Sequence, residues 1–275
     1  MRVIRIRWVS AIAALCCGAC TAVAADASRG LIDVYATLAN QKFVDLTHTF
    51  GPKTPHWKGF GEEKVVELYT IKKDGFLVQQ FTHVGQWGTH IDAPAHFHEG
   101  LRTIDQIPLQ QMVLPLVVID VHDKVARNPD YTLKVEDINN WETRHGPIPE
   151  RAFVAMRTDW SKRSGRDYVN MREDGQHTPG PCPEVVRFLV EERDLHGFGT
   201  ETIGTDAGQA FHFNPPYPAH YYMHGKGRYG LQCLANLDLL PPTGSVILAA
   251  PLKIRRGSGS PLRVLALVPR AESRA

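Results

Sequence analysis

The chain has few cysteines, no marked excess of one charge and, after its first residues, no long apolar run. Its 275 residues include 31 Lys and Arg against 29 Asp and Glu, a formal net charge of +2. Proteins that bind a polyanion usually carry a larger positive excess, so no nucleic acid partner is expected. With no repeats or low-complexity segments, 43% hydrophobic and 22% charged residues indicate a globular protein that can bury a core.

The beginning of the chain is predicted to be a signal peptide that covers residues 1–24. Three arginines within the first seven positions precede an Ala-rich apolar stretch at 8–23, and Ala22 to Ala24 have the pattern of a cleavage site. Lipid attachment at Cys20 is the alternative. We therefore expect a periplasmic or secreted protein, without membrane contact after cleavage, whose residues 25–275 form one domain.

Loss of the signal peptide would leave only Cys182 and Cys233 of the five cysteines. An oxidising compartment permits a disulfide between them, but two cysteines do not make a disulfide scaffold. Two buried free thiols fit the sequence at least as well.

Strand patterns outnumber helix patterns. Residues 114–121 form a continuous apolar run that is typical of a strand buried on both faces. Residues 64–72 and 76–83 flank Asp74-Gly75, a favoured turn pair, and predict a hairpin. Further strands are expected at Phe153–Met156, Gly197–Ile203, Val246–Leu252 and Leu262–Val268.

The clearest helix pattern is Pro183–Leu195, which has proline near its first turn and one apolar stripe. Residues 208–230 are rich in Gly, Pro and aromatics and predict a long irregular loop of the kind that often carries function. Together these patterns predict a single α/β domain with a β-rich core.

Histidines cluster between residues 83 and 98. His90 and Asp92 lie two apart, so an extended strand presents both side chains on one face. Pro94 ends the strand and can direct His96 back toward the same point. Imidazole and carboxylate on one face are the minimum of a divalent metal site. Histidines of a surface loop are the simpler alternative, but six specified residues at fixed spacing favour the metal site.

This segment resembles the signature of the cyclase family of metal-dependent hydrolases, which includes bacterial kynurenine formamidase and isatin hydrolase. Residues 86–96 match His-x-Gly-Thr-His-x-Asp-x-Pro-x-His at six of seven positions. Segments 45–48, 156–160 and 204–206 resemble further family motifs, in the same order. The resemblance implies a swivelling β/β/α fold and a chain that is similar above all to isatin hydrolase.

Two positions depart from the pattern of the two-zinc formamidases: Gln86 replaces a histidine and Gln232 replaces a glutamate. The loss of a negative charge makes two neighbouring cations harder to hold. The resemblance to the isatin hydrolase subgroup then implies one Mn²⁺ per chain, held by His90, Asp92 and the amide oxygen of Gln232. Zn²⁺ is the alternative metal.

The resemblance also assigns roles around the metal. His96 is expected to shuttle a proton between the metal-activated water and the leaving nitrogen; its alternative role is a fourth metal ligand. His220 is free to contact substrate or to orient a ligand. Trp57, Trp87 and Gln86 are candidates for the wall of a flat substrate pocket, although each tryptophan could equally be ordinary core.

The reaction that this family resemblance implies is hydrolysis of a cyclic amide, isatin to isatinate. Alternatives are a kynurenine formamidase-like amidase or a lactonase with another substrate, and a secreted metal- or ligand-binding protein without turnover. The expected partner is a small molecule, and the family implies a homo-oligomer, commonly a dimer.

Overall fold

The computed structural model describes residues 30–270. The chain divides into two compact units, one that ends at Gln41 and one that begins at Lys42. The described part of the first unit contains helix α1 (Leu31–Ala39), and each residue of this helix is exposed. The predicted signal peptide and Cys20 lie outside the described residues. In residues 30–270 no helix has the length and apolar character needed to cross a bilayer.

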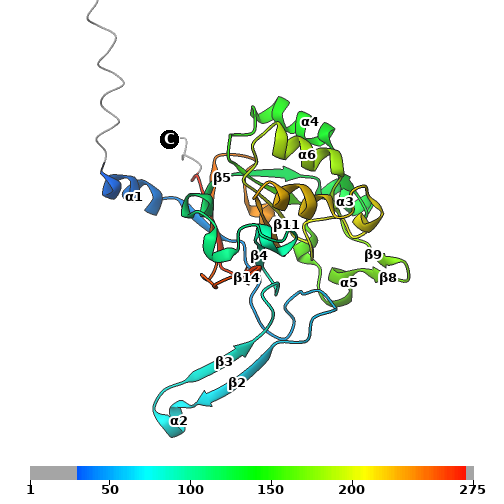
Figure 1. Ribbon diagram of the computed structural model, residues 1–275. Helices are drawn as coiled ribbons and strands as arrows, with labels where there is room; N and C mark the ends of the chain where they lie inside the picture. Colours follow the sequence, from blue (N-terminus) through cyan, green and yellow to red (C-terminus); the bar gives the residue numbers. More distant parts are fainter. Residues whose placement is uncertain (1–29, 271–275) are drawn as a thin grey trace, which may run out of the picture. The chain divides into compact units, whose positions relative to one another are not determined.

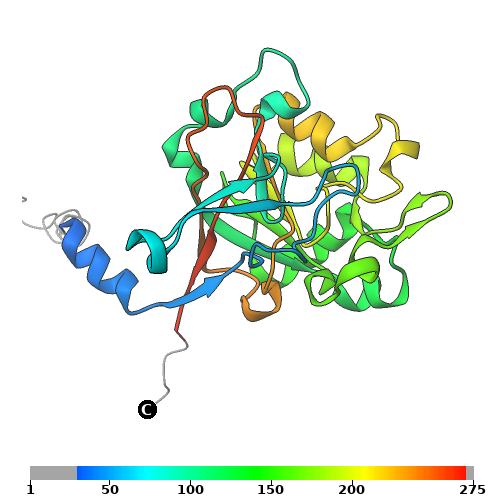
Figure 2. The same cartoon turned by 90° about the horizontal axis from the view of Figure 1, so that it is seen from below.

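A nine-stranded sheet forms the second unit, in the order β1-β15-β13-β5-β7-β11-β12-β4-β14 (Figure 1). β5, β7, β11 and β12 are parallel, and all other neighbours are antiparallel. β1 and β15 come from opposite ends of this unit and lie side by side (Figure 2). The strands are β1 (Lys42–Asp45), β4 (His90–Asp92), β5 (Val113–Asp120), β7 (Phe153–Arg157), β11 (Gly197–Thr200), β12 (Tyr229–Gln232), β13 (Ser245–Ala249), β14 (Gly259–Pro261) and β15 (Val264–Val268).

Both faces of the sheet are buried, as the run at 114–121 predicts. Along β5, Val117 and Ile119 join one apolar cluster, whereas Leu116 and Val118 join a second cluster on the opposite face. This alternation follows from the period of two along a strand. The β-rich α/β domain predicted from the sequence is therefore confirmed.

The expected strands are present, with shifted ends. β11 ends at Thr200 rather than at Ile203, because the chain turns there and Thr200 hydrogen-bonds the carbonyl of Gly204. β13 ends at Ala249, three residues before the predicted end. β14 is a short edge strand that the sequence pattern did not reveal.

Helices pack on the apolar cluster that contains Val117 and Ile119. α4 (Val135–His145) and α6 (Pro183–Glu191) contact each other, and α6 buries the predicted stripe of four apolar residues. α6 ends four residues before the predicted Leu195. Asp194 takes a left-handed conformation (φ 46°), and the amide of Leu195 then bonds to the carbonyl of Leu189, which closes the helix. The smaller elements are α3 (His122–Arg127), α5 (Gly165–Val169), β6 (Thr132–Leu133), β8 (Met171–Arg172), β9 (Gly175–Gln176) and β10 (Gly180–Pro181).

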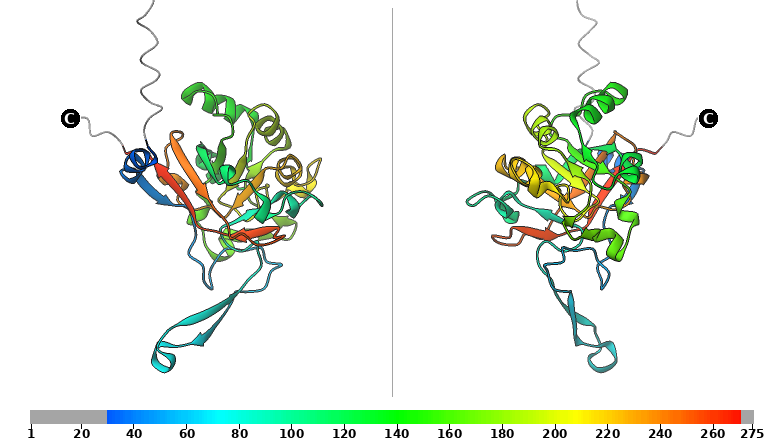
Figure 3. Two further views of the ribbon diagram at one scale, coloured as in Figure 1. Left: turned by 60° about the vertical axis from the view of Figure 1, so that its left-hand side comes forward. Right: turned by 90° about the vertical axis from the view of Figure 1, so that its right-hand side faces the viewer.

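The predicted hairpin is present as an arm that extends away from the sheet (Figures 1 and 3). It consists of β2 (Lys64–Tyr69), α2 (Ile71–Asp74) and β3 (Val78–Thr82). The predicted tight turn is wrong: α2 is a helical turn, begun where the Asp74 carboxylate accepts from the amide of Thr70 (2.9 Å). Gly75 ends this helical turn in the left-handed region (φ 83°). Because the helical turn begins at Ile71, the first strand stops at Tyr69 instead of Lys72. We call residues 64–82 the arm.

The expected irregular loop at 208–230 contains two short helical segments. η5 (Ala210–His212) is a 3₁₀ turn, and η6 (Ala219–His224) is a π-helical segment directly before β12. π-helical segments are rare and often occur at functional sites. Cys182 and Cys233 are both free thiols.

Candidate metal centre

The strand with the histidine motif lies between two others, which bury it. β4 pairs with β12 and β14, so that His90 faces Gln232 across the sheet, and His90 and Asp92 are 3% and 0% exposed. The Nδ1 of His90 bonds to the carbonyl of Gly88 (2.8 Å), which leaves Nε2 for the site. Gly88 has φ 59°, and a Cβ there would lie 2.6 Å from Thr54. The glycine is therefore needed both for the turn and for space.

Asp92 is the centre of the cluster. Its Oδ1 lies 3.7 Å from the Nε2 of His90, and its Oδ2 lies 3.7 Å from the Nε2 of His220. Burial alone would raise the pKa of this carboxyl. The neighbouring imidazoles of His90 and His220, each 3.7 Å away, outweigh burial and hold the pKa well below its ordinary value. Asp92 is therefore an anion in a buried place, which a cation would stabilise.

His220 is oriented by a second carboxylate. Asp206 accepts from its Nδ1 (2.5 Å) and also from the amides of Ala219 and His220, where η6 begins. Burial lowers the pKa of His220, but the bonds to Asp206 and Asp92 outweigh it and raise the pKa to about 10. A carboxylate on the outer nitrogen of an imidazole is typical of histidines that bind metals.

His224 is a further candidate ligand, to which the sequence analysis gave no role. It is completely buried, and its Nδ1 bonds to the carbonyl of Arg228 (3.0 Å). Burial and the neighbouring His220 lower its pKa to about 4, so the imidazole is neutral, the form that binds metals. Ligand atoms of Asp92, His220 and His224 all lie within 4.8 Å of one another. The spacing of four between the two histidines, one turn of a helix, was the available signal.

Three atoms of this cluster are buried without a hydrogen-bond partner among the described residues: His90 Nε2, Asp92 Oδ1 and His224 Nε2. Buried polar atoms normally have a partner, because leaving one unpaired costs about 1–3 kcal/mol. Asp92, His220 and His224 are the residues whose ligand atoms lie close enough to share one ion, and His90 Nε2 lies 3.7 Å from Asp92 Oδ1; imidazole and carboxylate are suitable donors for a divalent metal ion. The residues present therefore fit the metal that the family implies.

The structure places Gln232 at the site, but with its amide turned away from the predicted role. Its Oε1 accepts from the amide of Gly204 (2.9 Å), and its Nε2 donates to Oδ2 of Asp92. The backbone donor at Gly204 selects this orientation, because a turned amide would point one donor at another. In this structure Gln232 therefore donates to the candidate ligand Asp92. For the predicted contact with a metal, Oε1 would have to bind the ion while it also accepts from the amide of Gly204.

His96 lies at the wall of the site, as the motif predicts. It ends the 3₁₀ turn η1 (Pro94–His96), and its ring centroid is 5.8 Å from that of His220. Gln86 donates from Nε2 to Nδ1 of His96 (3.3 Å) and to Oγ of Ser258 (3.2 Å). The proton of a neutral His96 is therefore on Nε2.

Most of the cluster lines a pocket of about 470 Å³: His90, Asp92 and His220 face it, whereas His224 is not part of its lining. Trp57, Gln86 and His220 line it as predicted. Trp87 does not: it is 2% exposed and stacks on His56, with ring centroids 3.8 Å apart, so the core alternative describes this tryptophan. The other aromatic residues of the wall are Phe60, Phe211 and Tyr217.

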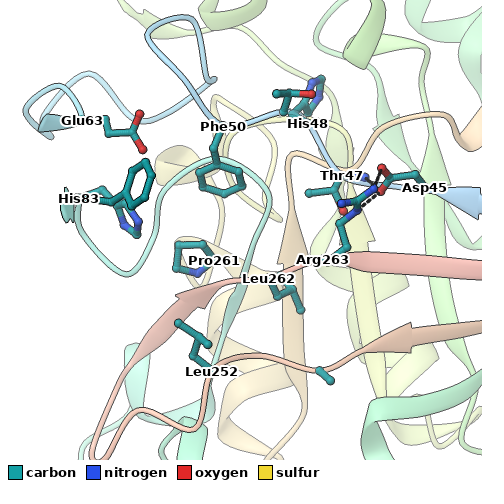
Figure 4. Close-up of a pocket in the computed structure, with 13 residues that line it drawn as sticks. Asp45, Thr47, His48, Phe50, Glu63, His83, Leu252, Pro261, Leu262 and Arg263 are labelled. Atoms are coloured by element: carbon teal, nitrogen blue, oxygen red, sulfur yellow. Dashed lines mark hydrogen bonds and ion pairs between the residues drawn. The ribbon is translucent and has the colours of Figure 1, made fainter. Parts of the chain in front are cut away.

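Another cavity, of about 720 Å³, lies at the root of the arm and shares no residue with the metal pocket. Phe50, Leu252 and Pro261 surround it, and Arg263 pairs with Asp45 at its rim (Figure 4). Its lining includes no member of the metal cluster.

Comparisons with known proteins find similar sequences and structures. Residues 44–207 match the family model described as "Putative cyclase". The chain is 40% identical over 243 residues to an isatin hydrolase of Roseibium aggregatum (83% of this chain, 92% of the relative). It is 27% identical to a kynurenine formamidase of Salinibacter ruber (81% and 95%). The solved structure of isatin hydrolase A from Labrenzia aggregata superposes with a TM-score of 0.84 at 50% identity (87% and 99%).

Proposed function

The chain belongs to the cyclase family, and on this premise we propose that it is a metal-dependent hydrolase that opens a cyclic amide, isatin to isatinate. The similarity to two isatin hydrolases supports the substrate. The single observation that carries the chemistry is the set of buried, unpaired atoms on His90 and Asp92, which line the pocket, and on His224, whose ligand atom lies within 4.8 Å of that of Asp92.

These residues would hold a divalent ion, which would supply polarisation of the carbonyl under attack and a lower pKa of water. His90 and His224 offer Nε2, and Asp92 offers a carboxylate oxygen. His220 can also offer Nε2, because Asp206 holds its Nδ1. Its proton would leave when the metal binds, since metal binding displaces protons from ligands. The proposed ion is Mn²⁺, one per chain. The additional imidazole of His224 makes Zn²⁺ the competitor.

The proton transfer is proposed for His96. With the Gln86 amide turned so that its oxygen accepts from Nδ1, the neutral imidazole has its proton on Nδ1, and Nε2 takes the proton from water and returns it to the leaving ring nitrogen. The carbon–nitrogen bond of the lactam breaks, the former carbonyl carbon becomes a carboxylate, and the nitrogen becomes an aromatic amine. Trp57, Phe60 and Tyr217 enclose a space that fits a flat bicyclic ring.

The experiment is turnover of isatin by purified protein that has been stripped with a chelator and reloaded with Mn²⁺ or Zn²⁺. Rapid formation of isatinate that depends on reloading is expected. Metal that binds without turnover of isatin would contradict the substrate. N-formylkynurenine is then the next compound, because a kynurenine formamidase is also a relative.

We also propose that two copies of the chain associate through the arm. Nine large apolar side chains of the arm are 38% to 68% exposed. An isolated two-stranded ribbon is at best marginally stable in water. Together these side chains offer on the order of 800 Å², the share of one partner in a standard interface. A two-fold axis would bring the tip of each arm to the cavity at the root of the other copy's arm, whose lining includes Phe50, Leu252 and Pro261.

Export to the periplasm or outside the cell remains the proposal for localisation, with residues 1–24 as the signal. The Arg-rich start and the Ala-x-Ala end support it. N-terminal sequencing of exported protein would give residue 25 as the first residue, whereas a lipid-modified Cys20 would show the alternative.

A further inference from the structure

A third cavity, of about 930 Å³, adjoins the metal pocket. Lys58 and Met171 line both, so these two side chains form a shared wall. The cavity is strongly cationic, whereas the metal pocket includes Asp92 and Asp206. Lys53, Lys58, Arg163 and Arg166 line the cavity, and no Asp or Glu is found among the described residues of its lining.

No carboxylate in the described chain neutralises these four cations through an ion pair. Within residues 30–270 none of the four makes an ion pair within 4 Å, whereas Arg157, Arg193, Arg228 and Arg263 all do. The charges of the chain nearly balance overall, so the concentration of positive charge is local. Such a cavity attracts anions, since its unpaired charges add in one place.

The cavity also has a rigid, apolar side. The Arg163 guanidinium lies 3.7 Å from the ring centre of Trp160, and this stacking fixes its direction. Burial lowers the pKa of Arg163, so an anion there would offset its lost hydration. Tyr168 and two prolines add apolar surface, and the buried Nε2 of His48 has no hydrogen-bond partner in the described chain.

We propose that this cationic cavity is a binding site for a small aromatic carboxylate, and that it takes up the carboxylate product as that product leaves the metal pocket. The second half of this statement depends on the proposed function. Hydrolysis of a lactam converts a neutral ring into an anion with a flat aromatic part. Unpaired cations beside an apolar floor recognise this combination and do not favour the neutral substrate.

Binding of phenylglyoxylate to the metal-loaded full chain, measured by titration calorimetry, tests the site. The double variant Lys53→Gln/Arg166→Gln removes two exposed cations, neither of which lines the metal pocket. We expect about tenfold weaker binding. The matched control is Arg127→Gln/Arg144→Gln, which removes two cations from a cavity that also includes Asp120, Asp123 and Asp137. The control should bind like the unaltered chain, whose own binding should weaken as NaCl is raised.

Equal binding by the Lys53/Arg166 variant and the unaltered chain would overturn the proposal, as would equal loss in the control. In assays with isatin, the inhibition constant of added isatinate should rise by the same factor in the Lys53/Arg166 variant. If isatin is not turned over but phenylglyoxylate binding shows the expected pattern, the anion site stands and the proposed reaction fails. If turnover is found but phenylglyoxylate does not bind beyond the metal, the reaction stands and the anion site fails.

Discussion

The metal pocket and the arm are opposite kinds of surface. At the pocket, polar atoms of His90 and Asp92, and of the neighbouring His224, are buried without partners among the described residues. In the arm, apolar side chains such as Val66 and Phe76 are about half exposed on a ribbon that has no layer to cover it. Each arrangement is unfavourable by itself, and each indicates what stabilises it: a cation in the pocket and apolar surface of another chain on the arm. The two regions therefore lead to different experiments, on metal content and on association.

The largest expected effect follows from Asp92→Asn. The change keeps the shape of the side chain and removes the buried negative charge that lies between His90 and His220. We expect loss of bound metal and a fall in turnover of about 10³-fold or more. Elemental analysis and the isatin assay measure both. The association state should stay unchanged, and full metal content in this variant would contradict the proposed centre.

The second effect separates a proton shuttle from a ligand. His96→Ala should lower turnover by about 10²–10⁴-fold while the metal stays bound. Loss of the metal together with activity would make His96 a ligand instead. Gln86→Ala is the companion variant, because Gln86 bonds to the same imidazole at Nδ1 and not at Nε2. It should lower turnover less than His96→Ala does.

The third effect concerns the arm alone. Val66→Lys/Phe76→Lys places two charges on its apolar surface and should weaken association of two chains by about 100-fold. Sedimentation velocity over a concentration series measures this. Thr143→Lys, on an exposed position of α4, is the control. An unaltered chain that sediments as a monomer at all concentrations would refute the arm as a contact between copies.

The smallest effect is a pH dependence of the stability of a second ribbon, β8–β9. This ribbon lines the metal pocket with Met171 and Gln176. His177 follows it and is held between Asp130 (2.7 Å) and Asp174 (2.9 Å). These hydrogen bonds, first that of Asp130, raise the pKa of His177 above its ordinary 6.5. Its contribution to stability is thus complete below about pH 6.5 and is lost as the pH rises through the raised value.

Thermal unfolding at pH 6 and pH 9 measures the contribution of His177. We expect a loss of about 1–2 °C at the higher pH that is absent in His177→Gln. The same pH difference in both proteins would show that other groups cause it. The short ribbon at the pocket is therefore held by ion pairs of its own chain, unlike the arm.

Local patterns predicted the strand of the metal site and the return of His96. Both depend on neighbours in sequence: Gly88 for the turn, the period of two for His90 and Asp92, and Pro94 for the end of the strand. The buried run of β5 and the stripe of α6 were predictable for the same reason. Periodicity records which side chains face the core.

Features that depend on contacts distant in sequence were not predictable. The position of His224 depends on how η6 packs against η1, far away in the chain. The orientation of the Gln232 amide depends on a backbone amide at Gly204, and the burial of Trp87 depends on His56. The helical turn of the arm depends on a local bond, from the amide of Thr70 to the carboxylate of Asp74, which the turn pair Asp74-Gly75 does not reveal. A sequence pattern gives residue types but not these partners.

Asp206 links the beginning of η6 to the imidazole of His220 through one carboxylate. A substitution there changes the path of a loop and the basicity of a candidate ligand in one step. Selection for tighter or looser metal binding can therefore act on the loop between residues 206 and 219 without replacing any ligand. In directed evolution of this chain, that loop is where metal preference can change while the histidine motif stays constant.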